Sequence, residues 1–160
     1  MRLMIVVLSL TITPALLAAQ GSPSQSVPHA IVVMPDQVTW KAAPPSFPAG
    51  AQGAVLEGNP AEEGPFTMRL SFPDGYRIPP HFHAGVERVT VIQGTFRVGM
   101  GDKFDASAMS ALPTGTFAAL QPGTRHYAEA DGKTIVQLNG IGPWKLTYVN
   151  PADDPRKKTP

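Results

Sequence analysis

The chain of 160 residues contains no cysteine. This absence excludes disulfide bonds, thiolate metal ligands and a thiol nucleophile, so the domain must be stabilised by an ordinary core. Charged residues make up only 16% of the chain, and 13 basic residues nearly balance 12 acidic ones. A nucleic-acid-binding face would need an excess of basic residues, which this composition does not provide. The chain also lacks a Ser-His-Asp order, a P-loop and a dinucleotide-binding fingerprint.

Long apolar runs are also missing, apart from one at the N-terminus. Residues 1–19 have a single charge at Arg2, an apolar stretch broken by Pro14, and two small residues at the end, Ala18 and Ala19. This pattern predicts a secretory signal peptide, cleaved after Ala19 or after Gly21. An uncleaved anchor is the alternative, although the run barely reaches the ~20 residues of a membrane span. We therefore expect a periplasmic or secreted protein with no stable membrane insertion after cleavage.

The rest of the chain has the pattern of one small β domain. Residues 20–30 are predicted to be a flexible linker, residues 31–150 the domain and residues 151–160 a tail. Apolar residues alternate with polar ones in several segments separated by Gly, Pro and Asp, most clearly at Phe66, Met68, Leu70 and Phe72. About eight to ten short strands are expected, which indicates an all-β sandwich or barrel.

Two local features are predicted within this strand pattern. Residues 88–93 and 95–100 flank Gly94 and are predicted to form a hairpin. Residues 106–112 have the one helical composition in the mature chain and are predicted to form a helix of at most about two turns. Residues 127–130 and 134–139 are expected to form two further strands.

Three of the four histidines occur in two short segments that could meet at a metal ion. His81 and His83 are two residues apart, so in a strand they share a face, and Glu87 follows in the same register. His126 follows a Pro-Gly turn at the start of another strand. Nitrogen and oxygen ligands suit one divalent transition metal ion, such as Fe, Mn, Ni, Cu or Zn. The fourth histidine, His29, lies in the predicted linker and is expected to be solvated.

These segments resemble the two sequence motifs of the cupin superfamily. The first motif, G(X)5HXH(X)3,4E(X)6G, is matched by Gly75, His81, His83, Glu87 and Gly94. The second motif, G(X)5PXG(X)2H(X)3N, is matched by Gly115, Gly123 and His126, and it departs at Gln121, where proline is usual, and at Ala130, where asparagine is usual. The resemblance spans residues 75–130. It implies a cupin jelly-roll β-barrel, also called a double-stranded β-helix, with one metal ion bound by His81, His83, Glu87 and His126, and a homodimer.

The cupin fold carries many activities, so three functions stay open. The first is an exported divalent-metal enzyme, dioxygenase-like or isomerase-like, acting on a small organic substrate, with Glu87 as a ligand or a catalytic base. The second is a non-catalytic barrel that binds a small ligand, and the third is a metal sensor, against which export argues. Gln137 faces opposite to Val136 and Leu138 and is a candidate hydrogen-bond donor beside the bound cofactor.

Overall fold

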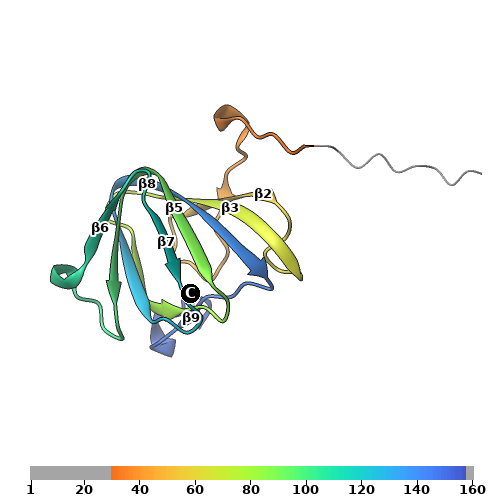
Figure 1. Cartoon of the computed structure of the whole chain (residues 1–160). Coiled ribbons are helices and arrows are strands. Elements are labelled where there is room, and N and C mark those ends of the chain that lie inside the picture. The colour runs from red at the N-terminus through yellow and green to blue at the C-terminus, as the bar shows by residue number, and fades with distance from the viewer. Residues whose placement is uncertain (1–29, 158–160) are drawn as a thin grey trace, which may run out of the picture. The chain divides into compact units, whose positions relative to one another are not determined.

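The computed structural model describes residues 30–157, and half of these residues lie in β-strands (Figure 1). The predicted signal peptide and all but the last residue of the predicted linker lie outside the described residues. The strands are β1 (Lys41–Ala42), β2 (Gln52–Glu57), β3 (Gly64–Phe72), β4 (Arg77–Phe82), β5 (Glu87–Met100), β6 (Ser110–Pro113), β7 (Phe117–Leu120), β8 (His126–Gly142) and β9 (Thr147–Tyr148). The short 3₁₀ helices are η1 (Pro35–Gln37), η2 (Ala106–Ala108), η3 (Pro151–Asp153) and η4 (Pro155–Lys157). Within residues 30–157, no helix is long and apolar enough to cross a membrane.

The long strand β8 organises the sheet. It pairs with β3, β4 and β5, and every pairing is antiparallel. Strand β5 continues the sheet to β6 and β7, while β2 and β1 extend it beyond β3. The strands curl around a common interior, as Figure 1 shows for β5, β7 and β8. The predicted all-β jelly-roll fold is confirmed.

The interior of this barrel holds the hydrophobic core. Phe66, Met68, Leu70 and Phe72 of β3 are at most 3% exposed, as their alternation with more exposed neighbours predicted. Phe72 stacks on Phe96 of β5, with ring centroids 5.8 Å apart. Burial of these large side chains stabilises the domain by roughly 1.5–3 kcal/mol for each side chain. An ordinary core therefore takes the place of the missing disulfides.

The hairpin predicted at Gly94 is wrong, because residues 87–100 form the single strand β5. The register against β8 shifts on both sides of Gln93, so the chain bulges at this point instead of turning back. Gly94 has φ +77°, and a Cβ there would lie 2.6 Å from the carbonyl oxygen of Lys133. The glycine therefore marks a close approach of two strands. The two strands expected at 127–130 and 134–139 are likewise one strand, β8.

The helix predicted over residues 106–112 is also wrong. Only the three residues of η2 are helical, and the side chain of Asp105 caps this turn by accepting a hydrogen bond from Ser107 N at 2.8 Å. Strand β6 begins at Ser110, and its Leu112 pairs with Phe96 of β5. Pairing with a neighbouring strand outweighs the helical propensity of this short segment.

Candidate metal centre

Three strands bring the predicted metal ligands together at one end of the barrel. His81 near the end of β4 pairs with His126 at the start of β8, and their ring centroids lie 4.1 Å apart. His83 follows the last residue of β4, and Glu87 is the first residue of β5. All four side chains belong to buried residues. One ring nitrogen from each histidine lies within 4.8 Å of the other two.

A turn fastens the second motif to the first. Thr124 N donates a hydrogen bond to the carbonyl oxygen of Gln121 at 3.0 Å, and Gly123 N donates one to the carbonyl oxygen of His83 at 2.8 Å. Gly123 has φ +76°, a conformation that favours glycine. Because this turn forms with Pro122 one position later than the motif expects, the departure at Gln121 leaves His126 in place.

The direction of each imidazole ring is set by a hydrogen bond at Nδ1. His81 Nδ1 lies 2.8 Å from the carbonyl oxygen of Pro79, His83 Nδ1 lies 2.9 Å from that of Lys145, and His126 Nδ1 lies 3.0 Å from that of Thr124. A carbonyl oxygen can only accept, so each Nδ1 carries the proton. In the neutral ring the lone pair is then on Nε2. All three histidines are thus prepared as acceptors of a cation at Nε2.

The carboxylate of Glu87 lies against these nitrogens. Its Oε2 is 3.1 Å from His126 Nε2 and 3.4 Å from His83 Nε2. Burial raises the pKa of Glu87, but contact with the His126 ring and the neighbouring rings of His83 and His81 together hold it below its ordinary value. Glu87 is therefore an ionised carboxylate in a buried place, where a compensating positive charge is required.

His81 and His83, in contrast, resist protonation. Burial, followed by the neighbouring His126 and His83, lowers the pKa of His81 to about 3, and burial lowers the pKa of His83. Within residues 30–157, His83 Nε2 is the one buried side-chain nitrogen or oxygen without a hydrogen-bond partner. His83 Nε2 is thus a neutral nitrogen without a partner, and it lies beside the carboxylate of Glu87. A divalent cation bound between them would be contacted by both groups.

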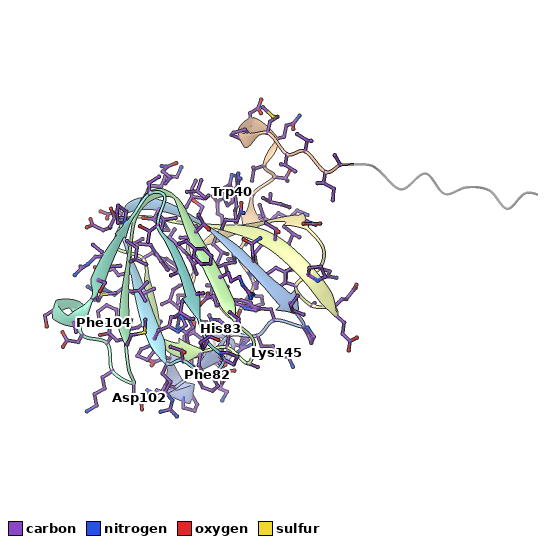
Figure 2. The ribbon with its side chains drawn as sticks, in the orientation of Figure 1. Trp40, Phe82, His83, Asp102, Phe104 and Lys145 are labelled. Atoms are coloured by element: carbon purple, nitrogen blue, oxygen red, sulfur yellow. The ribbon has the colours of Figure 1, made fainter. Side chains whose placement is uncertain are left out.

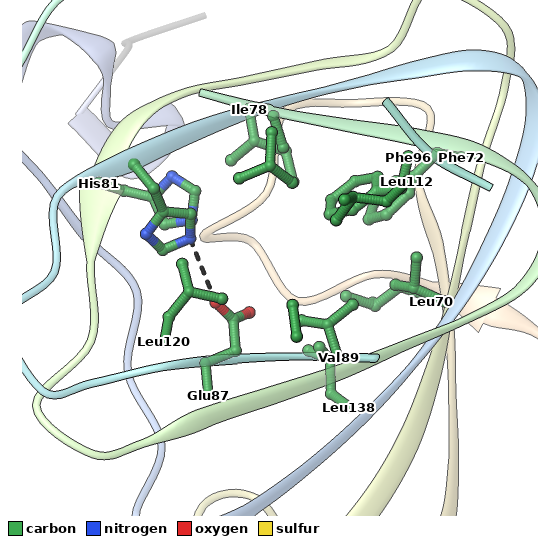
Figure 3. Close-up of a pocket in the computed structure, with 15 residues that line it drawn as sticks. Leu70, Phe72, Ile78, His81, Glu87, Val89, Phe96, Leu112, Leu120 and Leu138 are labelled. Atoms are coloured by element: carbon green, nitrogen blue, oxygen red, sulfur yellow. Dashed lines mark ion pairs between the residues drawn. The ribbon is translucent and has the colours of Figure 1, made fainter. Parts of the chain in front are cut away.

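The site opens onto an apolar cavity in the barrel (Figure 3). His81, Glu87 and His126 contribute the titratable groups to its lining. The other lining residues are apolar, namely Leu70, Phe72, Ile78, Val89, Phe96, Val98, Leu112, Ala118, Leu120, Ala128, Val136 and Leu138. The free space is about 20 Å³, enough for roughly one water molecule. The site thus combines a polar end with dry, apolar walls.

Gln137 does not join the site. As expected it faces opposite to Val136 and Leu138, but those two residues line the cavity, so Gln137 lies on the outer face of β8. Its Oε1 accepts a hydrogen bond from Arg69 Nε at 3.2 Å. The period-two alternation of the strand therefore turns Gln137 away from a cofactor bound at the histidines, which corrects the role expected for it.

The sequence did not point to two groups that contact His83. The indole of Trp144 stacks on the imidazole of His83, with centroids 4.3 Å apart and an interplanar angle of 18°. The carbonyl oxygen of the next residue, Lys145, accepts the Nδ1 hydrogen bond of His83. Figure 2 labels both His83 and Lys145. Stacking between an indole and an imidazole from distant segments cannot be predicted from their spacing in the sequence, and neither can the position of a backbone carbonyl.

Comparison with known proteins places these residues in a family context. A family model described as the ChrR cupin-like domain matches residues 28–143. The polyketide cyclase RemF from Streptomyces resistomycificus is similar in structure, with a TM-score of 0.64 and 15% identity over 78% of this chain and 88% of that chain. A candidate acetylacetone dioxygenase from Methylibium petroleiphilum has a TM-score of 0.58 and 25% identity over 78% and 83% of the two chains. An RmlC-like cupin from Ralstonia eutropha has a TM-score of 0.57 and 20% identity over 77% and 74%. No curated protein matches the chain.

Proposed function

The chain belongs to the cupin superfamily through its ChrR cupin-like domain, and from this premise we propose that it is an exported metal-binding protein. A divalent transition metal ion is held by His81, His83 and His126, with Glu87 as the fourth ligand. The observation that carries this proposal is the convergence of three histidines whose Nδ1 atoms are all occupied by carbonyl oxygens. This arrangement leaves three Nε2 lone pairs directed at one buried place.

We further propose that the site is catalytic toward a small, weakly polar organic substrate. A bound metal ion would polarise a substrate oxygen as a Lewis acid or support oxygen chemistry. The chain's own contribution is to hold three neutral imidazoles, to balance charge with Glu87, and to exclude bulk water with apolar walls. Glu87 could instead act as a base. If its carboxylate did not bind the metal, Oε2, which lies 3.1 Å from His126 Nε2, would be available to accept a proton.

Two observations favour a dioxygenase-like reaction over other cupin activities. The cavity walls are apolar beyond the metal-binding end, which suits a small hydrophobic substrate and molecular oxygen. The candidate acetylacetone dioxygenase from Methylibium petroleiphilum shares 25% identity over 78% of this chain. Small β-diketones are therefore the first substrate class to assay.

The size of the cavity supports a second candidate function. With about 20 Å³ of free space, the interior accepts little more than a water molecule unless the walls move. Apart from His81 and His126, Glu87 is the one titratable group that lines it. A protein that binds metal without catalysis, for example as a sensor, would have these same features.

Elemental analysis of the mature protein from its native compartment tests the proposal. We expect about one metal ion per chain, lost in His81→Ala and His126→Ala and retained in the control His29→Ala. Iron or manganese, together with oxygen uptake on addition of a β-diketone, supports the dioxygenase-like reading. Zinc without oxygen uptake supports the second candidate. Absence of metal from carefully handled wild-type protein overturns the metal site.

Export is tested separately on the same preparation. We expect the purified chain to start at or near Gln20, or at Ser22 if cleavage follows Gly21, and to be found outside the cytoplasm. An intact N-terminus on a cytoplasmic protein would contradict this part of the proposal and remove the main argument against a sensing role.

A further inference from the structure

One of the three histidines is oriented by a distant part of the chain. His81 and His126 each donate Nδ1–H to a carbonyl two residues earlier, at Pro79 and Thr124. His83 instead donates to the carbonyl of Lys145, 62 residues away in sequence. The orientation of His81 and His126 is therefore local, whereas that of His83 depends on where residues 144–146 lie.

Residues 144–146 are not part of a strand, so other contacts must hold them. Trp144 N donates a hydrogen bond to the carbonyl oxygen of Pro60 at 2.7 Å, and the Trp144 indole packs edge-on against Phe66 with centroids 6.2 Å apart. The side chain of Leu146 is only 2% exposed within the core. These contacts hold one side of the segment against β3 and the preceding loop.

The C-terminal turns hold its other side. Arg156 Nη2 donates to the carbonyl oxygen of Leu146 at 3.3 Å. The guanidinium is itself fixed by Asp154, through Nε to Oδ1 at 2.7 Å and Nη2 to Oδ2 at 2.8 Å. A guanidinium held by two hydrogen bonds to a carboxylate has a defined direction. The Asp154–Arg156 pair therefore fixes the backbone at Leu146, the residue after Lys145, whose carbonyl oxygen accepts the hydrogen bond of His83.

We infer that Trp144 and the Asp154–Arg156 pair are positioning residues for His83. The indole fixes the plane of the imidazole by stacking, and the pair fixes the Lys145 carbonyl that determines which nitrogen is free. Among the described residues, His83 Nε2 is the one buried side-chain nitrogen or oxygen without a hydrogen-bond partner. Its lone pair is available to a cation, so the orientation of the imidazole ring decides where a cation can bind. Metal affinity is thus set in part by the C-terminal residues. The link to metal binding rests on the proposed function, whereas the orientation of His83 does not.

The test compares Arg156→Gln with Lys157→Gln in the full mature chain. Arg156 clamps the segment, whereas the neighbouring Lys157 is exposed and has no side-chain partner in the described residues. Affinity for Co²⁺ is measured by competition with a chromophoric chelator. Loss of a group that orients a metal-binding histidine typically costs 10–100-fold. We expect about a tenfold loss in Arg156→Gln, a similar or larger loss in Trp144→Phe, and none in Lys157→Gln.

A second measurement separates positioning from general stability. In the metal-free protein, the Nδ1–H signal of His83 is followed by ¹H–¹⁵N NMR, with the signals of His81 and His126 as internal controls. We expect Arg156→Gln and Trp144→Phe to shift or broaden the His83 signal alone. Unchanged His83 signals and unchanged Co²⁺ affinity in folded variants would overturn the inference. If wild-type protein binds no Co²⁺, the proposed function fails. The NMR signals would still show whether Trp144 and the Asp154–Arg156 pair orient His83.

Discussion

Glu87 is the residue on which the charge of the site depends. It is ionised although buried, and two of the histidines around it, His81 and His83, have a pKa that burial lowers, so they stay neutral. A divalent cation would remove the resulting excess of negative charge, and the imidazole lone pairs would complete its coordination. The candidate metal site therefore depends on charge balance as well as on ligand geometry.

Replacing this charge while keeping its shape gives the first prediction. Glu87→Gln is expected to lower the affinity for a divalent metal by roughly 10–100-fold, because the amide neither carries charge nor binds metal well. Metal titration of the apoprotein measures the effect. Glu57→Gln, at an exposed position in β2, serves as the control and should bind like wild type. Equal affinities for all three proteins would remove Glu87 from the metal site.

The histidine pKa values predict how stability depends on pH. The pKa of His81 is lowered to about 3, and that of His83 is also lowered, so the unfolded chain takes up protons at pH values where the folded one does not. The apoprotein should therefore be most stable above about pH 6.5 and should lose stability as the pH falls below this value, with His81 alone contributing roughly 1.4 kcal/mol per pH unit. The lowered pKa of Glu87 acts in the same direction below its ordinary value of 4.5.

Urea unfolding of the apoprotein between pH 7.5 and 4.5 measures this dependence. His81→Asn lacks one of the titrating groups and should show a shallower decline than wild type over the same range. A wild-type stability that stays level or rises on acidification would show that these histidines become protonated in the folded state.

At the level of elements, the long pair β5–β8 is held by close contacts at glycines. Gly99 of β5 pairs with Tyr127 of β8, and a Cβ on Gly99 would lie 2.2 Å from the tyrosine ring. Tyr127 is 1% exposed, packs on Phe104 and donates its hydroxyl to the carbonyl oxygen of Asp105 at 3.1 Å. Tyr127 and the half-buried Phe104 thus pack outside the barrel core, against the strand pair that begins with Glu87 and His126.

This packing predicts that Gly99→Ala is destabilising. The added methyl group must displace the Tyr127 ring, and overpacking of this kind costs about 1–3 kcal/mol. Chemical denaturation gives the change in free energy of unfolding. Gly53→Ala in β2 is the matched control, because its nearest neighbours would be at least 3.6 Å from the new Cβ. A cost for Gly99→Ala no larger than that for Gly53→Ala would mean that the tyrosine moves freely.

At the level of the whole molecule, exposed apolar residues gather near the start of the described chain. Ile31, Val32 and Met34 are 63%, 73% and 53% exposed. Apolar groups clustered in this way favour an interface with another protein surface. The homodimer expected from the cupin resemblance would cover such residues.

Light scattering of the mature protein is expected to give twice the mass of one chain. Serine at positions 31, 32 and 34 should weaken the dimer, because the apolar surface available for burial is reduced. Ile141→Ser, at a position 62% exposed elsewhere in the domain, is the control and should remain dimeric. A monomeric wild type at micromolar concentration would contradict the expectation.

The fold class and the residues that gather at the candidate site could both be predicted from the sequence. The alternation of apolar and polar residues in β3 is a local pattern, and so is the spacing of His81, His83 and Glu87 along the chain. The Pro-Gly turn before His126 is equally local. Such features are readable from sequence because backbone geometry relates neighbouring residues directly.

Only the tertiary structure decided the features that depend on contacts between distant segments. The bulge at Gly94 and the unbroken strands β5 and β8 follow from their pairing with each other, which outweighs the turn propensity of glycine. Gln137 lies outside the barrel because the curl of the sheet decides which face of β8 is the inner one. The carbonyl of Lys145 reaches His83 across 62 residues, and no side-chain pattern encodes the position of a backbone oxygen.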